Sequence, residues 1–156
     1  MNDPDFLATL ERMYKDAKLL FEEKEYYNCC YLSGYVLECA LKYILCTFGL
    51  KDDGTRYTIN DAKQFTHRIQ NLNLALEQCI SAGAGVPAQY QIMPENMCPY
   101  IFTSVNGYPY WNPKYRYGEH PMWATEDWSR HYIEELDAIF HMWEYHFHPV
   151  HVLLAA

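Results

Sequence analysis

The sequence lacks several patterns that would assign it to a well-defined class of protein. Its six cysteines, at positions 29, 30, 39, 46, 79 and 98, include no Cys-x-x-Cys pair, which argues against a zinc knuckle or a dithiol redox site. No apolar run approaches the roughly 18 residues that a transmembrane helix needs, so we expect no association with a membrane. The stretch from Met1 to Asp5 has neither the basic region nor the apolar core of a secretory signal. We therefore expect a cytoplasmic protein with reduced, buried cysteines.

Basic residues are also scarce. The chain has 12 Lys and Arg against 20 Asp and Glu, a formal net charge of -8. Proteins that bind nucleic acid through its backbone use Lys and Arg to neutralise phosphates, so this balance argues against general nucleic-acid binding but leaves room for a local basic pocket. Half of the 156 residues are hydrophobic and 21% are charged, which excludes a disordered chain. At this length we expect a single domain, residues 1–156, with one core.

Four segments carry the apolar spacing of amphipathic helices. A fold built from them is all-α: an antiparallel up-and-down bundle of four or five helices. Between the second and third segments, residues 50–65 are expected to form a polar connection. The expected helices span about residues 4–24, 26–48, 66–81 and 125–148.

Residues at the helix ends support these boundaries. Asp3 is expected to cap the first helix, with Pro4 at its first position, where no amide hydrogen is needed. Gly49 is expected to end the second helix, and Thr125 to cap the last one. Gly34, inside the second helix, costs roughly 1 kcal/mol relative to alanine, which we explain by the close approach of a neighbouring helix.

A long aromatic-rich insertion, residues 84–123, precedes the last helix. It contains six prolines, and so long a segment without structure is uncommon in a compact domain. We therefore expect it to hold short elements. Asn106-Gly107 is a hairpin-turn signal between residues 101–105 and 108–111, and Pro109 would restrict the second arm to a sheet edge.

Histidines gather near the C-terminus, at positions 141, 146, 148 and 151, together with Glu144. Metal sites often combine such residues on one helix face. However, there is no His-Glu-x-x-His motif, and Pro149 interrupts the helical geometry. We therefore predict no metal site and interpret the cluster as a solvated helix end.

A second cluster of chemically capable residues lies at the end of the insertion. Trp111, Arg116, Tyr117 and His120 combine rings with a guanidinium, which can stack on a nucleobase or hold a phosphate. The alternative is structural: Tyr and Trp are common packing residues, and Arg116 would then pair with a buried carboxylate such as Glu38.

The second helix carries a third cluster along one side: Tyr27, Tyr31, Glu38 and Lys42. A carboxylate beside the apolar stripe must be paired if it is buried. We predict that Glu38 pairs with Lys42 or Arg116 and is not a general base.

The ordered set of these motifs resembles the HEPN domain family (higher eukaryotes and prokaryotes nucleotide-binding). A small-residue helix in that family closes in Glu-x-x-Leu-Lys, a Thr-His step opens the next helix, an Arg-Tyr pair precedes the last long helix, and Thr-Glu-Asp begins it. The matching residues here are Glu38, Leu41 and Lys42, then Thr66-His67, Arg116-Tyr117 and Thr125-Glu126-Asp127.

The resemblance implies a helical bundle, usually dimeric, with a role near nucleotides or RNA. It also implies a context of prokaryotic toxin–antitoxin or defence systems, often beside a nucleotidyltransferase. Many members of the family are metal-independent ribonucleases, with an Arg and a His in a late helix separated by about four to six residues. No Arg in this sequence meets that spacing, since three residues separate Arg116 from His120.

We therefore predict a non-catalytic binding module, related to nucleotides or RNA or to a protein partner, without cofactor or metal. The alternatives are a ribonuclease toxin that uses a shifted Arg116/His120 pair, and a structural subunit paired with a nucleotidyltransferase. The apolar tail, residues 150–154, predicts a homodimer, because exposed patches of this kind usually mark interfaces. The candidate ligand-binding residues are Arg116, Tyr117, Trp111, Lys42, Glu38, His67 and His120.

Overall fold

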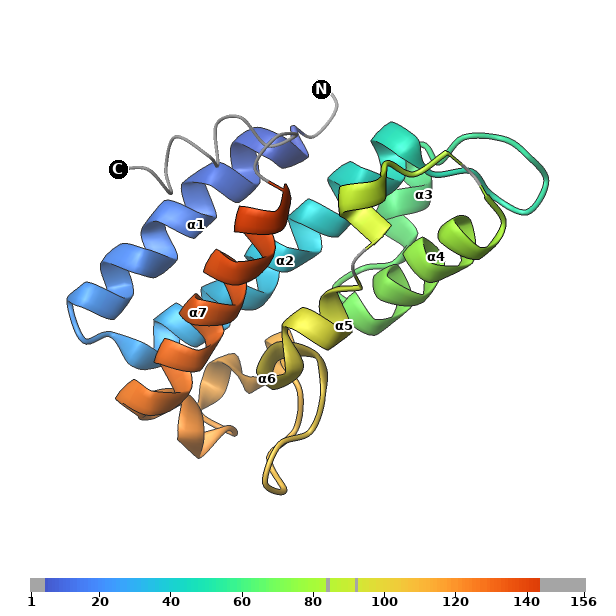
Figure 1. Ribbon diagram of the computed structural model, residues 1–156. Coiled ribbons are helices and arrows are strands. Elements are labelled where there is room, and N and C mark those ends of the chain that lie inside the picture. The colour runs from blue at the N-terminus through green and yellow to red at the C-terminus, as the bar shows by residue number, and fades with distance from the viewer. Residues whose placement is uncertain (1–4, 84, 92, 144–156) are drawn as a thin grey trace.

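The protein is described by a computed structural model at residues 5–83, 85–91 and 93–143. Within these residues it is an all-α bundle with no strand, as expected (Figure 1). The α-helices are α1 (Phe6–Glu22), α2 (Tyr26–Phe48), α3 (Ile59–Gln64), α4 (Ile69–Ser81), α5 (Pro94–Met97), α6 (Pro99–Phe102) and α7 (Glu126–Trp143). Three short 3-10 helices are η1 (Ala88–Gln91), η2 (Pro113–Tyr117) and η3 (Pro121–Ala124).

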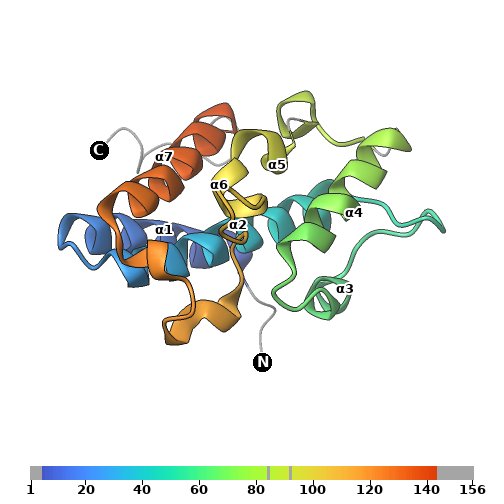
Figure 2. The same ribbon diagram turned by 90° about the horizontal axis from the view of Figure 1, so that it is seen from below.

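Helix α2 is the centre of the fold. It has the expected bounds and packs against α1, α4 and α7, which surround it in both views (Figures 1 and 2). Within the described ranges, it is the one helix long and apolar enough to cross a membrane by length and composition alone. However, 72% of its most apolar window is buried inside the bundle, as in the core helix of a globular domain.

Helix α1 lies antiparallel to α2, because only a tight turn joins them. The cap is Asp5 and not Asp3: the carboxylate of Asp5 accepts a hydrogen bond from the amide of Ala8 at 2.9 Å. The expected cap and Pro4 lie outside the described residues. On α1, the hydroxyl of Tyr14 donates to Asp137 of α7, and Lys18 forms an ion pair with the same carboxylate, so side-chain contacts join the first and last helices.

The expected polar connection contains a helix, α3, which corrects the prediction for residues 50–65. Its start is a capping box: the hydroxyl of Thr58 accepts from the amide of Asp61 at 3.2 Å, and the carboxylate of Asp61 accepts from the amide of Thr58 at 2.7 Å. These two reciprocal hydrogen bonds stabilise the start of a six-residue helix whose sequence shows little apolar periodicity.

Helix α4 begins at Ile69 and not at Thr66. The backbone of Thr66 has a φ of +52°, in the left-handed region that a right-handed helix cannot include. The Thr-His step therefore belongs to the turn before α4, and this turn sets the position of His67.

The insertion holds short elements, as expected. Five short helices lie in its described residues, and four of them begin at a proline, where the missing amide hydrogen has no helical partner to lose. These prolines are Pro94, Pro99, Pro113 and Pro121.

The turn that the sequence signals at Asn106-Gly107 is present, but no pair of strands extends from it within the described residues. Val105 and Tyr108 exchange two backbone hydrogen bonds of 2.9 Å across Asn106 and Gly107, whose φ angles are +52° and +82°. The pairing is a single isolated bridge. Pro109 follows directly and has no amide hydrogen with which to extend the ladder.

Helix α7 begins after Thr125, as predicted. The hydroxyl of Thr125 accepts from the amide of Trp128 at 3.3 Å. In the first turn, Arg130 forms ion pairs with Glu126 and Asp127. Most of the predicted histidine cluster lies outside the described residues, namely Glu144 and three of the four histidines. The apolar tail lies outside them as well.

Candidate functional site

Two tyrosines form the centre of the candidate site. Tyr31 and Tyr35 lie one turn apart on α2, so their side chains share a face of the helix. Their ring centroids are 5.2 Å apart in an edge-to-face arrangement, and their hydroxyls are 3.2 Å apart. Both are partly exposed. We refer to Tyr31, Tyr35 and the three side chains described next, His67, Arg116 and Tyr117, as the tyrosine face.

Arg116 covers one end of this face. It extends from η2, and its Cζ lies 5.7 Å from the ring centroid of Tyr31 and 5.0 Å from that of Tyr117. Tyr117 is 79% exposed, and Arg116 is exposed as well. In the described part of the chain, Arg116 forms no ion pair; the predicted partner Glu38 is bound elsewhere. The guanidinium thus lies within cation–π distance of both rings, while its N–H groups form no hydrogen bond in the described part of the chain.

Glu38 lies on the same side of α2, buried beneath the surface. One carboxylate oxygen is 3.2 Å from Nζ of Lys42, which confirms the predicted ion pair. The other oxygen is 2.8 Å from Nδ1 of His67, a partner that we did not predict. Lys42 is also buried and donates to the carbonyl of Thr66 at 3.0 Å. Each charge in this group is therefore paired, as burial requires.

His67 covers the other end of the tyrosine face. Its ring meets the ring of Tyr35 edge-on, with centroids 5.1 Å apart, and its side chain is 51% exposed. Nδ1 is hydrogen-bonded to the carboxylate of Glu38, and within the described residues Nε2 has no hydrogen-bond partner. The preceding residue, Thr66, is β-branched and has a positive φ, a combination that costs free energy.

The two segments that flank the face are locally basic in an acidic protein. Residues 62–76 contain Lys63, His67 and Arg68 and no carboxylate, and residues 96–118 contain Lys114 and Arg116 and no carboxylate. The net charge of -8 therefore resides elsewhere in the chain. Because nearby charges dominate at short range, this face can attract an anion although the whole protein is acidic.

Trp111 supports the face from below. Its indole is 1% exposed, Nε1 donates to the backbone carbonyl of Tyr31 at 3.1 Å, and its ring meets that of Tyr35 at 5.0 Å. The side of α2 that receives the indole is open because residue 34 is glycine: a Cβ there would lie 1.9 Å from two indole atoms. The predicted close neighbour of Gly34 is therefore this indole and not a helix.

His120 lies inside the core, away from solvent. Its Nε2 is 3.1 Å from the carbonyl of Pro109, so this nitrogen donates and Nδ1 carries no proton in the neutral ring. Burial lowers the pKa of His120 below its usual range. The ring stacks on Trp123, with centroids 5.3 Å apart. His120 and the exposed Arg116 therefore do not form a pair that faces solvent together.

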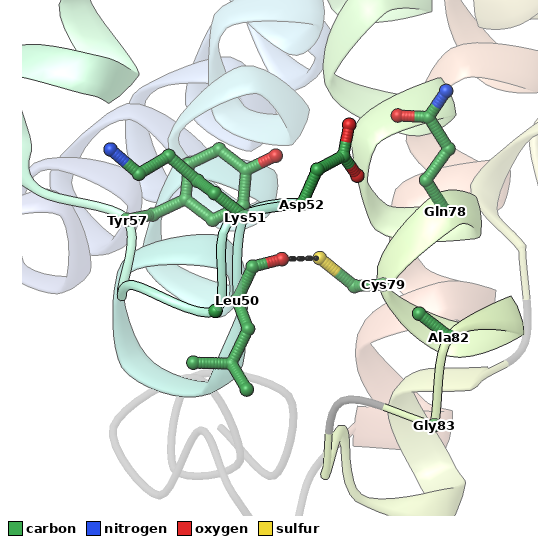
Figure 3. Close-up of a pocket in the computed structure, with 9 residues that line it drawn as sticks. Leu50, Lys51, Asp52, Tyr57, Gln78, Cys79, Ala82 and Gly83 are labelled. Atoms are coloured by element: carbon green, nitrogen blue, oxygen red, sulfur yellow. Dashed lines mark hydrogen bonds between the residues drawn. The ribbon is translucent and has the colours of Figure 1, made fainter.

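A hollow lies away from this face, between the loop after α2 and the C-terminal end of α4 (Figure 3). Its volume is about 290 Å³, and Cys79 donates to the carbonyl of Leu50 at 3.2 Å across it. Lys51, Asp52 and Gln78 contribute polar side chains. None of the seven predicted site residues lines it.

Sequence reasoning identified Arg116, Tyr117, Glu38, Lys42 and His67, which the structure brings to one side of α2. It included Tyr31 among the helix residues but not in the site, and it overlooked Tyr35. The signal was available, because residues four apart on a helix lie on the same face. The role of His67 beside Glu38 was not predictable from spacing, because the two residues are 29 positions apart and a left-handed turn lies between them.

Comparison with known proteins supports the resemblance. The family model for the HEPN domain matches residues 6–83, half of the chain, and includes α1 to α4. No curated protein and no solved structure matches the chain. Within the described residues, no group of three or more His, Cys, Asp or Glu side chains is placed to hold a metal ion. By its family match and its helical architecture, the chain belongs to the HEPN domain family.

Proposed function

We propose that this protein is a non-catalytic binding module whose tyrosine face recognises a nucleotide or a short single-stranded RNA. The observation that carries the proposal is the state of Arg116: exposed, stacked on Tyr31 and Tyr117, and without an ion pair among the described residues. An arginine held in this way has its charge and N–H groups directed to solvent, as phosphate recognition requires.

The surroundings of Arg116 suit a ligand with both a ring and a phosphate. Single-stranded nucleic acids are bound mainly by stacking of bases on aromatic side chains or guanidinium planes, combined with contacts to the phosphate backbone. Tyr117 offers a largely exposed ring, and His67 offers a second polar group at the opposite end.

The ribonuclease alternative has less support. General acid–base cleavage needs a proton donor or acceptor within reach of the reacting hydroxyl, together with a cation near the developing charge. In the Arg116/His120 pair that this alternative uses, only Arg116 is exposed, and the ring of His120 is buried against Trp123. The geometry therefore favours binding over cleavage by this pair.

Calorimetric titration tests the proposal, with the dinucleotide ApA, adenosine and inorganic phosphate as probes. We expect ApA to bind more tightly than either half, because a ring and a phosphate are recognised together. Arg116→Ala should weaken ApA binding by about tenfold or more, because the variant loses charge-assisted hydrogen bonds to the phosphate.

Arg130→Ala is the matched control. Arg130 also lies over a ring, that of Phe21, but its charge is paired with Glu126 and Asp127. This variant should bind ApA within about twofold of the wild type. No binding of any probe at millimolar concentration, or equal binding by Arg116→Ala and the wild type, would overturn the proposal and leave the tyrosine face as a surface for a protein partner such as a nucleotidyltransferase.

A further inference from the structure

We propose that Glu135 of α7 is a positioning residue for the tyrosine face, because it fixes the segment from which Trp111 reaches Tyr31 and Tyr35. The link consists of three consecutive hydrogen bonds, from α7 to α6, from α6 to Trp111 and from Trp111 to α2. This inference rests on the proposed function for its effect on binding, whereas its effect on Trp111 can be measured without a ligand. No covalent bond forms or breaks.

The carboxylate of Glu135 is buried against the start of α6. One oxygen, Oε2, accepts from the amide of Tyr100 at 2.8 Å, and Oε1 accepts from the amide of Ile101 at 3.1 Å. Amides in the first turn of a helix have no helical partner, and Cys98, which precedes α6, provides no side-chain cap. Glu135 therefore caps α6 from α7, and both of its oxygens are used.

The second link joins α6 to Trp111. The carbonyl of Ile101 accepts from the backbone amide of Trp111 at 2.8 Å. Ile101 thus donates to Glu135 through its amide and holds Trp111 through its carbonyl. Because both groups belong to one residue, a movement of α6 that breaks the first bond also moves the acceptor of the second.

The third link joins Trp111 to α2. Its indole Nε1 donates to the carbonyl of Tyr31 at 3.1 Å, and its ring meets that of Tyr35 at 5.0 Å. The indole has little freedom to turn, because it fills the space beside Gly34 that a Cβ would occupy. A displacement of the Trp111 backbone is therefore transmitted to α2 between Tyr31 and Tyr35.

The burial of a carboxylate at this point indicates a role beyond attachment of α6 to α7. Burial raises the pKa of Glu135 to about 7, although the two amide donors lower it, so the charge there costs free energy. The two helices already meet through aromatic packing: the ring of Tyr100 stacks on that of His131, with centroids 3.9 Å apart, and meets Trp128 edge-on. Apolar packing is non-directional, whereas two hydrogen bonds to one carboxylate define the orientation of α6.

Hydrogen exchange of the tryptophan indoles, measured by NMR, tests the link without a ligand. Each of the four tryptophans has one indole N–H, and Trp111→Phe identifies the signal of Trp111. At pH 8 we expect Glu135→Gln to speed exchange of the Trp111 indole by about tenfold, because glutamine has one acceptor oxygen and leaves one amide unpaired. The indole of Trp123, which donates to the hydroxyl of Tyr132 at 3.0 Å, is the internal reference and should not change.

Titration with ApA tests the consequence for the tyrosine face. Glu135→Gln should weaken ApA binding by about threefold, less than Arg116→Ala, because it removes no contact to the ligand. In the Trp111→Phe background, which lacks the bond to Tyr31, Glu135→Gln should have no further effect. Additive effects of the two substitutions would contradict a route through Trp111.

Glu134→Gln is the matched control, since Glu134 is the adjacent carboxylate on α7 and is exposed. It should leave both the exchange of Trp111 and the affinity for ApA unchanged. Glu135→Asp is the second variant if thermal melting shows that Glu135→Gln is unfolded. It keeps the charge but is one methylene shorter, so it cannot reach both amides and should give the same selective change.

The outcomes separate this inference from the proposed function. Faster exchange of Trp111 alone, together with weaker ApA binding, supports the role of Glu135. Unchanged exchange would overturn it, as would equal acceleration of Trp111 and Trp123 or full ApA affinity in Glu135→Gln. If ApA does not bind to the wild type, the proposed function fails and with it the effect on binding, whereas the exchange of Trp111 still decides whether Glu135 fixes its position.

Discussion

The indole of Trp111 occupies the space that a Cβ on residue 34 would need. The ideal Cβ position at Gly34 is 1.9 Å from two indole carbons, far below any tolerated contact. Nε1 of Trp111 is fixed by the carbonyl of Tyr31, so the ring cannot shift without losing that hydrogen bond. An aromatic side chain from the insertion is thus docked directly on the backbone of α2.

Gly34→Ala should therefore destabilise the protein, although alanine is the better helix former by roughly 1 kcal/mol. Overpacking of a tight core typically costs about 1–3 kcal/mol, so we expect a net loss of free energy of unfolding of that order. Urea unfolding followed by circular dichroism measures it. A double-mutant cycle with Trp111→Phe supplies the control: the smaller ring should reduce the cost of the added methyl group. A more stable Gly34→Ala variant would contradict the contact.

Glu135 predicts a pH dependence of stability. Its buried carboxylate accepts from the amides of Tyr100 and Ile101, and burial raises the pKa of Glu135 to about 7 despite these two bonds. The folded state therefore binds this proton more tightly than the unfolded state, whose pKa is near 4.5. The contribution of Glu135 to stability is then lost as the pH rises from about 4.5 to 7, by roughly 3 kcal/mol.

Glu135→Gln isolates this effect, because glutamine resembles the protonated acid and does not titrate. Unfolding in urea at pH 5 and pH 8 gives the free energy of each protein. The stability of the wild type relative to Glu135→Gln should fall between these two pH values. His120, whose pKa is lowered by burial, acts in the opposite direction below its usual pKa, and it cancels in the comparison because both proteins contain it.

Thr66→Gly should stabilise the fold and weaken binding. Glycine adopts a positive φ without steric cost, and this gain exceeds the entropy that glycine loses on folding, so we expect an increase of up to about 1 kcal/mol. The looser turn should hold His67 less firmly and lower ApA affinity. Calorimetry and thermal unfolding of the same preparation measure both effects. Lower stability would show that Thr66 is not strained.

We expect the purified protein not to cleave RNA. The ring of His120 is buried, and Arg116 has no histidine at the family's ribonuclease spacing. Incubation with structured and unstructured RNA in the presence of a chelator is the assay. Cleavage that disappears in both Arg116→Ala and His120→Ala would contradict this prediction and support the ribonuclease alternative.

We also expect a homodimer, from the apolar residues 150–154. Light scattering at micromolar concentration gives the mass in solution. Replacing Leu153 and Leu154 with serine should convert a dimer into a monomer, whereas a monomeric wild type would count against this prediction.

Much of the bundle followed from local patterns. Apolar periodicity defined α2 to the residue, and Thr125 correctly marked the start of α7. Two predictions, of a polar connection at residues 50–65 and of a helix start at Thr66, were wrong because local hydrogen bonds and backbone conformation outweighed apolar periodicity. The capping box of Thr58 and Asp61 forms a helix within a polar segment, and the left-handed turn at Thr66 delays α4 by three residues.

The candidate site was predicted only in part, because its parts meet through tertiary contacts. Arg116 and Tyr31 are 85 positions apart in a chain with no periodic signal to join them, and their stacking depends on the fold of the insertion. The burial of His120 could not be predicted from the sequence for the same reason, because the rings that enclose it come from the insertion and from α7.

The contacts that close the bundle join residues far apart in the chain, which bears on how it folds during synthesis. The hydrogen bond of Trp111 to α2 spans 80 residues, and that of Tyr14 to α7 spans 123. A nascent chain that has released only α1 to α4 from the ribosome leaves the sides of α2 that Trp111 and α7 cover exposed to water. Native packing must therefore wait for the final third of the polypeptide, and until then the exposed apolar surface of α2 is a natural target for chaperones.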